Sequence, residues 1–332
     1  MRESIKALSK KIGIYDKIKK IKDRNNTANR KNIKNKKYVN KCISKKIKFE
    51  GNMLNKEKVC FILAGYKPFL NEIIFKRIKK FVDDDIEVCI LSSGLYSKEL
   101  SNIAKKNNWS YLSQKQNNVS MIQNTAINLF KSAKYIYKLD EDIFVTKDYF
   151  KTLMKTMNDC DKSGDYKVGF VAPTIPINGF GNLLVLKRFN LVDIYTKKFE
   201  KPLYAAGGDR MIENNPNVAK FFWGYENYVP KIDEMNKIVQ NDKFDYVACP
   251  IRFSIGAILF KRKLWEEMNM FEVKKGSGMG SDEKQICQHC MIKSRPIIVS
   301  KNSIVGHLSF GKQNEAMEKY FKENKDFFNI NN

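Results

Sequence analysis

From residue 58 onward, short apolar runs alternate along the chain with longer stretches of helical periodicity. Apolar runs bounded by Gly, Ser or Asp are typical of buried strands, and spacings of three and four between apolar residues indicate helices. Strands that alternate with helices form a parallel α/β sheet. We therefore expect strands at 59–64, 87–91, 110–112 and 135–139, and helices at 69–82, 97–107 and 120–132.

The chain is strongly positive, and its charge is unevenly distributed. The 332 residues include 61 Lys and Arg against 36 Asp and Glu, a formal net charge of +25, and 18 of the basic residues lie among the first 50. Such a charge is typical of proteins that bind nucleic acid. Only nine of the basic residues are Arg, however, whereas a nucleic-acid surface is expected to combine clustered Arg with exposed aromatic rings. The chain after residue 57 shows neither feature, so we expect no nucleic-acid partner.

Residues 1–57 are expected to form a basic amphipathic tail and a linker. In the first 24 residues apolar side chains recur at helical spacing among lysines, which suits a helix on an anionic membrane surface. A helix that packs on its own folded domain or on a partner protein would show the same pattern. Residues 25–50 have almost no apolar periodicity and are typical of a polar linker. The apolar positions are Ile5, Leu8, Ile12, Tyr15, Ile18 and Ile21.

The expected location is cytoplasmic, with the tail peripheral on the inner face of the plasma membrane. The first residues lack the apolar stretch of a secretory signal, and no apolar run approaches the roughly 18 residues that span a membrane. Seven Cys, an odd number, fit a reducing compartment. Cys287 and Cys290 form a CxxC pattern, but no second ligand pair lies nearby, so thiols facing the core are favoured over zinc.

Three acidic residues, Asp140, Glu141 and Asp142, directly follow the last predicted strand. In parallel α/β sheets ligands bind at the carboxyl ends of the strands. Positions i and i+2 of an extended segment share a face, so Asp140 and Asp142 can present two carboxylates together. Such oxygen ligands suit Mg²⁺ or Mn²⁺, and the diphosphate of a nucleotide-activated donor would add further ligands. An acidic turn without a ligand is the alternative.

Five segments carry a resemblance to a known family: 117–126, 133–142, 254–260, 280–283 and 304–307. Those around this triplet resemble the nucleotide-binding half of GT-A fold glycosyltransferases of family 2. The resemblance rests on the order and spacing of its pieces more than on any one of them, and it continues into the second half, covering about residues 58 to 310. The tail lies outside it.

This resemblance implies a GT-A (Rossmann-like) fold over residues 58–325, with a mixed, mainly parallel sheet flanked by helices. Residues 58–150 would be the nucleotide-sugar-binding half, and 151–325 the acceptor-binding and catalytic half. It also implies that Asp140, Asp142 and His307 hold Mn²⁺ or Mg²⁺, and that the donor is a nucleotide-sugar, with a UDP-sugar favoured. The donor-binding positions would be Ala64, Tyr66, Ser92, Ser93, Lys115, Asn124, Asp140 and Glu141.

Two positions depart from the family pattern. The second strand ends in Ser92 and Ser93 where family members usually carry an Asp that contacts the nucleobase, so the identity of the base is left open. Position 123 is Gln where an Arg is common, and Lys115 is the candidate for the missing diphosphate contact. A lysine of this kind is also common as a solvated surface residue.

The resemblance places an acidic catalytic pair at Asp282 and Glu283. Sugar transfer passes through an oxocarbenium-like centre, and a carboxylate there would act as general base for the acceptor hydroxyl in an inverting reaction. The order of the pair favours Asp282, whereas counting back from Ile286 as the first buried helical position favours Glu283. The alternative is that Ser281 or Asp282 caps the helix that follows.

The acceptor is expected to bind to residues 169–247, which have no clear family counterpart. Aromatic rings stack on sugars, so Trp223 and Tyr225 are candidates, with simple burial in the core as the alternative. A glycan, a lipid-linked sugar or a cell-surface polysaccharide precursor would suit a basic tail. A nucleotidyltransferase of related architecture is the competing enzyme class, but it would need a Gly-rich loop after the first strand, and residues 64–68 contain a single Gly.

Overall fold

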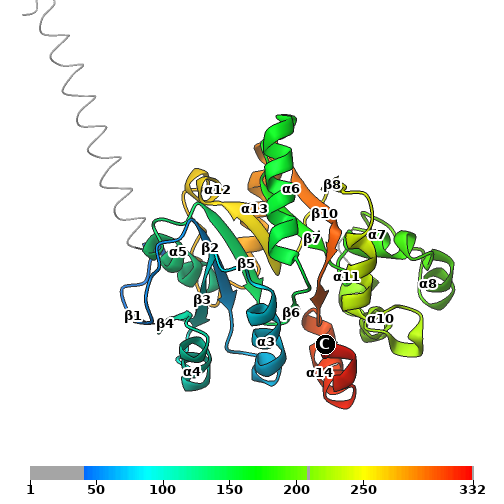
Figure 1. Cartoon of the computed structure of the whole chain (residues 1–332), viewed down its shortest axis with the longest axis horizontal. Helices are drawn as coiled ribbons and strands as arrows, with labels where there is room; N and C mark the ends of the chain where they lie inside the picture. The colour runs from blue at the N-terminus through cyan, green and yellow to red at the C-terminus, as the bar shows by residue number, and fades with distance from the viewer. Residues whose placement is uncertain (1–40, 208–209, 331–332) are drawn as a thin grey trace, which may run out of the picture.

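The computed structural model describes residues 41–207 and 210–330 and is built around one large twisted sheet (Figure 1). Within these residues the sheet has nine strands in the order β1-β4-β3-β2-β5-β9-β7-β10-β8. The strands are β1 Ile47–Glu50, β2 Lys58–Leu63, β3 Ile86–Ser93, β4 Ser110–Gln114, β5 Tyr135–Asp140, β7 Phe170–Thr174, β8 Tyr246–Cys249, β9 Ala257–Lys261 and β10 Ile297–Ile304.

The sheet is mixed and mainly parallel, as the sequence predicts. β2 pairs in parallel with β3 and β5, β3 with β4, and β10 with β7. β9 lies antiparallel between β5 and β7, while β1 and β8 close the two edges in antiparallel pairing. β2 and β3 read as nearly continuous apolar runs because both of their faces are covered.

Helices flank the sheet, and most of them are amphipathic. α5 packs on β2, β3 and β4, and α13 packs on α5, whereas α6 and α11 lie against β10. None of the described helices is long and apolar enough to cross a membrane. The helices are α3 Asn71–Phe81, α4 Lys98–Lys106, α5 Val119–Leu129, α6 Tyr149–Ser163, α7 Gly181–Arg188, α8 Val192–Lys198, α9 Met211–Asn214, α10 Pro216–Phe222, α11 Ile232–Gln240, α12 Arg262–Glu267, α13 Ser281–Ile292, α14 Asn314–Glu323 and α15 Lys325–Phe328.

The start of the folded domain differs from the prediction. Residues 47–50, expected to belong to the linker, form edge strand β1, which pairs antiparallel with β4 through Phe49 and Leu112. Cys42 is buried in the core as well. The linker pattern failed here because an edge strand with one exposed face needs few apolar residues. The predicted membrane helix falls in residues 1–40 and lies outside the described residues.

A second, two-stranded sheet joins the two halves of the chain. β6 (Ile143–Phe144) pairs antiparallel with β11 (Gly306–His307), with Ile143 opposite His307. The backbone N–H of Leu308 donates a 3.0 Å hydrogen bond to the carbonyl of Asp142. This pairing places His307 beside the acidic triplet that ends β5.

A buried arginine holds this small sheet against helix α3. The Arg77 side chain is fully buried and donates a forked pair of hydrogen bonds, 2.7 and 2.9 Å long, to the Asp233 carboxylate. It also donates to the carbonyl of Val145, at 3.1 Å, and to that of Phe328, at 3.0 Å. A guanidinium can be buried only where its charge and most of its N–H groups are paired. Arg77 therefore ties β6, α11 and the C-terminal helix α15 together.

Candidate active site

The candidate site lies where the parallel strands end. β2, β3 and β5 run in the same direction, and Leu63 at the end of β2 lies level with Leu91 and Asp140 on its neighbours. Their carboxyl ends therefore meet at one edge of the sheet. The acidic triplet at the end of β5 and the loop after β2 share this edge, as the topology of a parallel sheet requires.

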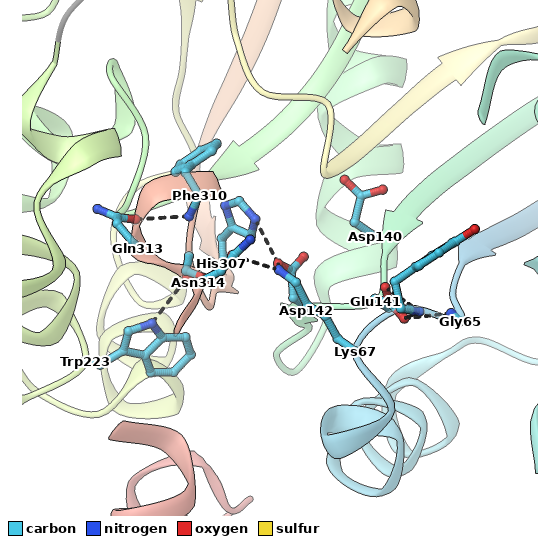
Figure 2. A network of polar contacts seen from close by, with 12 residues as sticks. Gly65, Lys67, Asp140, Glu141, Asp142, Trp223, His307, Phe310, Gln313 and Asn314 are labelled. Atoms are coloured by element: carbon cyan, nitrogen blue, oxygen red, sulfur yellow. Dashed lines mark hydrogen bonds and ion pairs between the residues drawn. The ribbon is translucent and has the colours of Figure 1, made fainter. Parts of the chain in front are cut away.

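Asp142 is the buried centre of the site (Figure 2). Its Oδ2 atom lies 3.3 Å from Nε2 of His307 and 2.5 Å from Nζ of Lys67. Burial acts to raise the pKa of Asp142, but His307 and Lys67 together outweigh it and hold that pKa well below the usual range of a carboxyl. Asp142 is therefore a carboxylate with two nitrogen groups on one of its oxygens.

Asp140 has a different partner and does not join this group. Its Oδ1 atom accepts a 2.6 Å hydrogen bond from Nζ of Lys138, a lysine that is itself buried. Burial is the main cause that raises the pKa of Asp140, and the charges of Asp142 and Asp282 act in the same direction. Figure 2 shows its carboxyl apart from those of Asp142 and Glu141.

The three predicted metal ligands are thus not assembled. Across the described residues no three His, Cys, Asp or Glu side chains form a group that could hold a metal. Asp142 and His307 do fit a divalent cation: ligand atoms at right angles on a six-coordinate ion lie about 3 Å apart, and Oδ2 and Nε2 are separated by 3.3 Å. A carboxylate and an imidazole are also donors that first-row divalent ions accept. Asp140 is bonded to Lys138, and its role as a metal ligand stays a prediction.

Glu141 holds a loop in place instead of facing a ligand. Its Oε2 atom accepts hydrogen bonds of 2.7 Å from the N–H of Gly65 and 3.0 Å from the N–H of Tyr66. These residues form the loop that follows β2, so the middle residue of the triplet fixes the segment that leads to Lys67. Its carboxylate is bonded to this loop, and the predicted role in donor binding stays a prediction.

The serines at the end of β3 are also engaged within the protein. Ser92 is fully buried, and its hydroxyl donates a 2.9 Å hydrogen bond to the carbonyl of Ala64. The Ser93 hydroxyl accepts the N–H of Asn118 at 2.6 Å. The hydroxyl of Tyr66 donates to the Ser93 carbonyl, also at 2.6 Å, while the side chain stays exposed at the edge of the site. Of these four predicted donor-binding residues, Tyr66 alone presents a large surface.

Of two further residues predicted to bind the donor, Asn124 is a buried structural residue, whereas Lys115 is exposed and its role stays a prediction. Asn124 is fully buried, its amide donates to the carbonyls of Cys42 and Phe271, and its Oδ1 atom accepts the indole N–H of Trp265. With these bonds it cross-links α5 to the chain before β1 and after α12, and it has no surface for a nucleotide. Lys115 is exposed next to β1, where its backbone N–H donates to the carbonyl of Lys46.

The acidic pair Asp282 and Glu283 occupies the first turn of α13. Asp282 is buried, and its Oδ2 atom accepts a 2.7 Å hydrogen bond from Nε2 of Gln123, the residue that stands where an Arg was expected. The N-cap of α13 is Gly280, and no side chain caps the helix, so the capping interpretation is wrong. Asp282 is close enough to Asp140 to raise the pKa of that residue.

Glu283 is more heavily engaged than Asp282. It forms an ion pair with Arg252, and its Oε2 atom accepts the N–H of Ile255 at 3.3 Å. Burial nevertheless outweighs these contacts and raises the pKa of Glu283. The two carboxyl groups therefore differ in how many of their oxygens the protein already uses.

The aromatic candidates divide into one core and one surface residue. Trp223 is buried against Phe144 and Phe328, and its indole N–H donates to the His307 carbonyl, so the core interpretation is correct for it. Tyr225, two residues later, is half-exposed. The thiols of the CxxC pattern are buried in the core as expected.

Sequence reasoning missed the two lysines of the site. Lys138 could have been found, because it precedes Asp140 by two residues on a strand and must share its face. Lys67 carries no such signal, since its contact with Asp142 depends on how Glu141 folds the loop after β2.

Comparisons with known proteins give distant similarities of shape. No protein-family model matches the chain, and no curated protein matches it. Among solved structures, GalNAc-T7 with UDP, GalNAc and Mn²⁺ aligns at 14% identity and a TM-score of 0.42, covering 83% of this chain and 50% of that one. The mannosyltransferase PcManGT from Pyrobaculum calidifontis with GDP-Man and Mn²⁺ aligns at 13% and 0.42, covering 82% and 62%.

A third similar structure belongs to another enzyme class. The 4-diphosphocytidyl-2C-methyl-D-erythritol synthase from Anaerococcus prevotii aligns at 10% identity and a TM-score of 0.38, covering 82% of this chain and 98% of that one. The chain spans between half and about three fifths of the length of the two transferases. The matching structures thus include glycosyltransferases and a synthase, and the family of this chain, family 2 included, stays a prediction.

Proposed function

We propose that this protein is a metal-dependent, inverting glycosyltransferase that moves a sugar from a nucleotide-sugar donor to an acceptor hydroxyl. One observation carries the proposal: Oδ2 of Asp142 and Nε2 of His307 lie 3.3 Å apart at the carboxyl edge of a parallel sheet, and the carboxyl of Asp282 is close enough to the neighbouring Asp140 to raise its pKa. This arrangement provides a place for a cation and its phosphates and, beside it, a group that can accept a proton.

In this proposal Asp142 and His307 hold Mn²⁺ or Mg²⁺. The bound ion would neutralise the charge that develops on the departing nucleoside diphosphate. The exposed ring of Tyr66 at the end of β2 is the surface offered to the nucleobase. Because both serine hydroxyls of β3 are bonded internally, we favour stacking over hydrogen bonding to the base edge, with a UDP-sugar still the first donor to test.

Asp282 is the proposed general base. Its Oδ2 atom is fixed by Gln123, and no hydrogen bond to its Oδ1 atom is present within the described residues, which leaves that oxygen for a substrate proton. Glu283, by contrast, has both oxygens in contact with Arg252 or Ile255. A general base must first lie within hydrogen-bond reach of the proton that it accepts, and its pKa matters only after that condition is met. We therefore choose Asp282 over Glu283, because the Oδ1 atom of Asp282 can accept a hydrogen bond from the substrate.

The transfer step follows from these positions. Asp282 takes the proton of the acceptor hydroxyl while the acceptor oxygen forms a bond to the anomeric carbon. The bond from that carbon to the diphosphate oxygen breaks on the opposite face, and its electron pair leaves with the nucleoside diphosphate. The configuration at the anomeric carbon is thereby inverted.

The acceptor we propose is a glycan, a lipid-linked sugar or a polysaccharide precursor. Two residues after the buried Trp223, whose indole contacts the backbone of His307, Tyr225 is half-exposed and offers a ring on which an acceptor sugar could stack. The basic segment before residue 41 would bring such an acceptor near by contact with an anionic membrane on its cytoplasmic side. The competing class, a nucleotidyltransferase, would need a Gly-rich phosphate loop, whereas the loop after β2 has one glycine.

The proposal is tested by incubating the full chain with Mn²⁺ and a panel of UDP-, GDP-, CDP- and TDP-sugars and measuring release of the nucleoside diphosphate. We expect release from at least one donor, and its loss on chelation of the metal. Absence of both binding and release across the whole panel would contradict the transferase proposal. Formation of pyrophosphate from a nucleoside triphosphate and a sugar phosphate would favour the competing class.

A further inference from the structure

Lys67 occupies the carboxylate oxygen that a metal ion at this site would need. Its Nζ atom lies 2.5 Å from Oδ2 of Asp142, and Nε2 of His307 approaches the same oxygen at 3.3 Å. The other contact of the Lys67 ammonium is the Oδ1 atom of Asn314, at 3.3 Å. Figure 2 shows the lysine reaching from the loop after β2 toward the carboxylate that faces His307.

The position of this lysine is built into the fold. Glu141 accepts the N–H groups of Gly65 and Tyr66, so the backbone immediately before Lys67 is fixed to the acidic triplet itself. Pro68 follows and opens the short helix η1 (Pro68–Leu70), which restricts the backbone of Lys67 from the other side. The two neighbouring carboxylates therefore have different partners: Glu141 accepts backbone N–H groups of the loop, and Asp142 forms an ion pair with the Lys67 ammonium.

The two lysines of the site differ in how easily they can leave. The Lys138 side chain is 4% exposed and lies on strand β5, between its sheet neighbours, so Asp140 keeps its partner. The Lys67 side chain is 21% exposed and lies on a loop. Its only other oxygen partner among the described residues, on Asn314, already accepts the hydroxyl of Ser309 at 2.7 Å. A flexible four-carbon stem lets a lysine change partners without moving its backbone.

We infer that Lys67 is an internal cation that competes with the divalent metal for Asp142 and is released when the metal binds. This inference rests on the proposed function. A metal on Oδ2 and an ammonium on the same oxygen would be like charges a few ångströms apart, so only one can stay. The released ammonium then needs an anion, and the diphosphate of the donor is the anion that the proposed function brings to this edge.

The competition has a thermodynamic consequence. When the metal binds without nucleotide, it breaks the ion pair between Lys67 and Asp142. The free energy lost with this ion pair weakens the binding of the metal. Metal binding together with a nucleoside diphosphate gives Lys67 a new partner, so that cost is recovered in part. Each ligand therefore strengthens the binding of the other, as linkage requires. Removing the charge of Lys67 should abolish the part of the coupling between metal and nucleoside diphosphate that depends on this lysine. It should also tighten the binding of the metal in the absence of nucleotide.

The experiment is a Mn²⁺ titration of the full chain, followed by electron paramagnetic resonance of the free ion, with and without UDP or GDP. We compare wild type with Lys67→Met and with Lys67→Arg, which keeps the charge. Lys58→Met is the matched control, because Lys58 is a lysine of similar exposure on the same strand-loop unit that pairs with Asp85 at the far end of β2. Thermal unfolding checks that every variant is folded.

We expect Lys67→Met to bind Mn²⁺ alone about tenfold more tightly than wild type, with Lys67→Arg and Lys58→Met close to wild type. Adding the nucleotide should tighten Mn²⁺ binding more in wild type than in Lys67→Met. Equal or weaker binding of Mn²⁺ by Lys67→Met, where wild type does bind it, would overturn the inference and leave the proposed function standing. Failure of wild type and all variants to bind Mn²⁺ even with nucleotide would overturn both.

Discussion

The indole N–H of Trp223 donates a 3.2 Å hydrogen bond to the backbone carbonyl of His307. This contact fixes the backbone of His307, whose imidazole faces Asp142. It depends on a close approach between the indole and Gly306. A methyl group on Gly306 would come within 2.3 Å of the indole ring, so only glycine fits at that position. Trp223, first considered as a ring on which a sugar could stack, is therefore a core residue that supports the backbone of His307.

Gly306→Ala should displace either the indole or strand β11. We expect a loss of about 1–3 kcal/mol in the free energy of unfolding, the usual cost of an overpacked core, together with weaker Mn²⁺ binding. Gly311→Ala is the control, because a methyl group there meets no atom within 4 Å. Urea unfolding and a Mn²⁺ titration measure the two effects. Equal stability of both variants would contradict the packing argument.

Asp140 and Asp142 should differ as metal ligands. Asp142 faces His307, whereas Asp140 is bonded to the buried Lys138. Asp142→Asn is expected to lower metal-dependent release of nucleoside diphosphate about a hundredfold or more, and to weaken Mn²⁺ binding in the absence of nucleotide. Asp140→Asn should weaken Mn²⁺ binding much less, as measured by the same titration. A similar loss of Mn²⁺ affinity in both variants would mean that Asp140 turns to the metal after all.

Asp282→Asn and Glu283→Gln should separate the two candidate bases. Removing a general base typically costs on the order of 10² to 10⁴ in rate, so Asp282→Asn should lower kcat on that scale while leaving the KM for the donor nearly unchanged. Glu283→Gln loses its ion pair with Arg252 but should keep most of the activity. Initial rates with a saturating acceptor measure both. A larger loss in Glu283→Gln would reassign the base.

Glu283 should also leave a signature in the pH dependence of stability. Burial raises the pKa of Glu283 above the ordinary value of 4.5, so the folded chain holds this proton more tightly than the unfolded chain. The stability that the group contributes is complete below pH 4.5 and is lost as the pH rises through the folded pKa. Glu283→Gln stays neutral throughout.

The free energy of unfolding of Glu283→Gln, relative to wild type, should therefore increase between pH 4 and pH 7. Urea midpoints of both proteins at the two pH values give this double difference, in which the other titrating groups cancel. An opposite sign would mean that Arg252 and the N–H of Ile255 outweigh burial.

Truncation should separate the basic tail from the folded domain. Deleting residues 1–40 is expected to leave the urea midpoint unchanged and to weaken binding to anionic liposomes, because most of the excess positive charge of the N-terminal region is removed. Deleting residues 1–50 also removes Cys42 and strand β1 and should lower the midpoint. Neutral liposomes are the control. Undiminished binding of the shorter chain to anionic liposomes would contradict the membrane role.

The sequence predicted the sheet well because buried strands carry their own signal. The apolar runs at 59–64 and 135–139 correspond to β2 and β5, and the triplet at 140–142 lies where strand polarity requires. β1 escaped prediction because an edge strand resembles a polar linker. The internal hydrogen bonds of Asn124, Ser92 and Glu141 could not be predicted, because the sequence does not show whether a polar side chain bonds inside the protein or faces a ligand.

The small sheet of β6 and β11 has a consequence for biosynthesis. Asp142 is translated long before His307, and the two meet only when the last strand pairs with residues near the middle of the chain. A nascent or prematurely terminated polypeptide could fold its β2–β5 unit and still lack the imidazole. The proposed centre would thus form only after residues 306–307 have been translated and β11 has paired with β6.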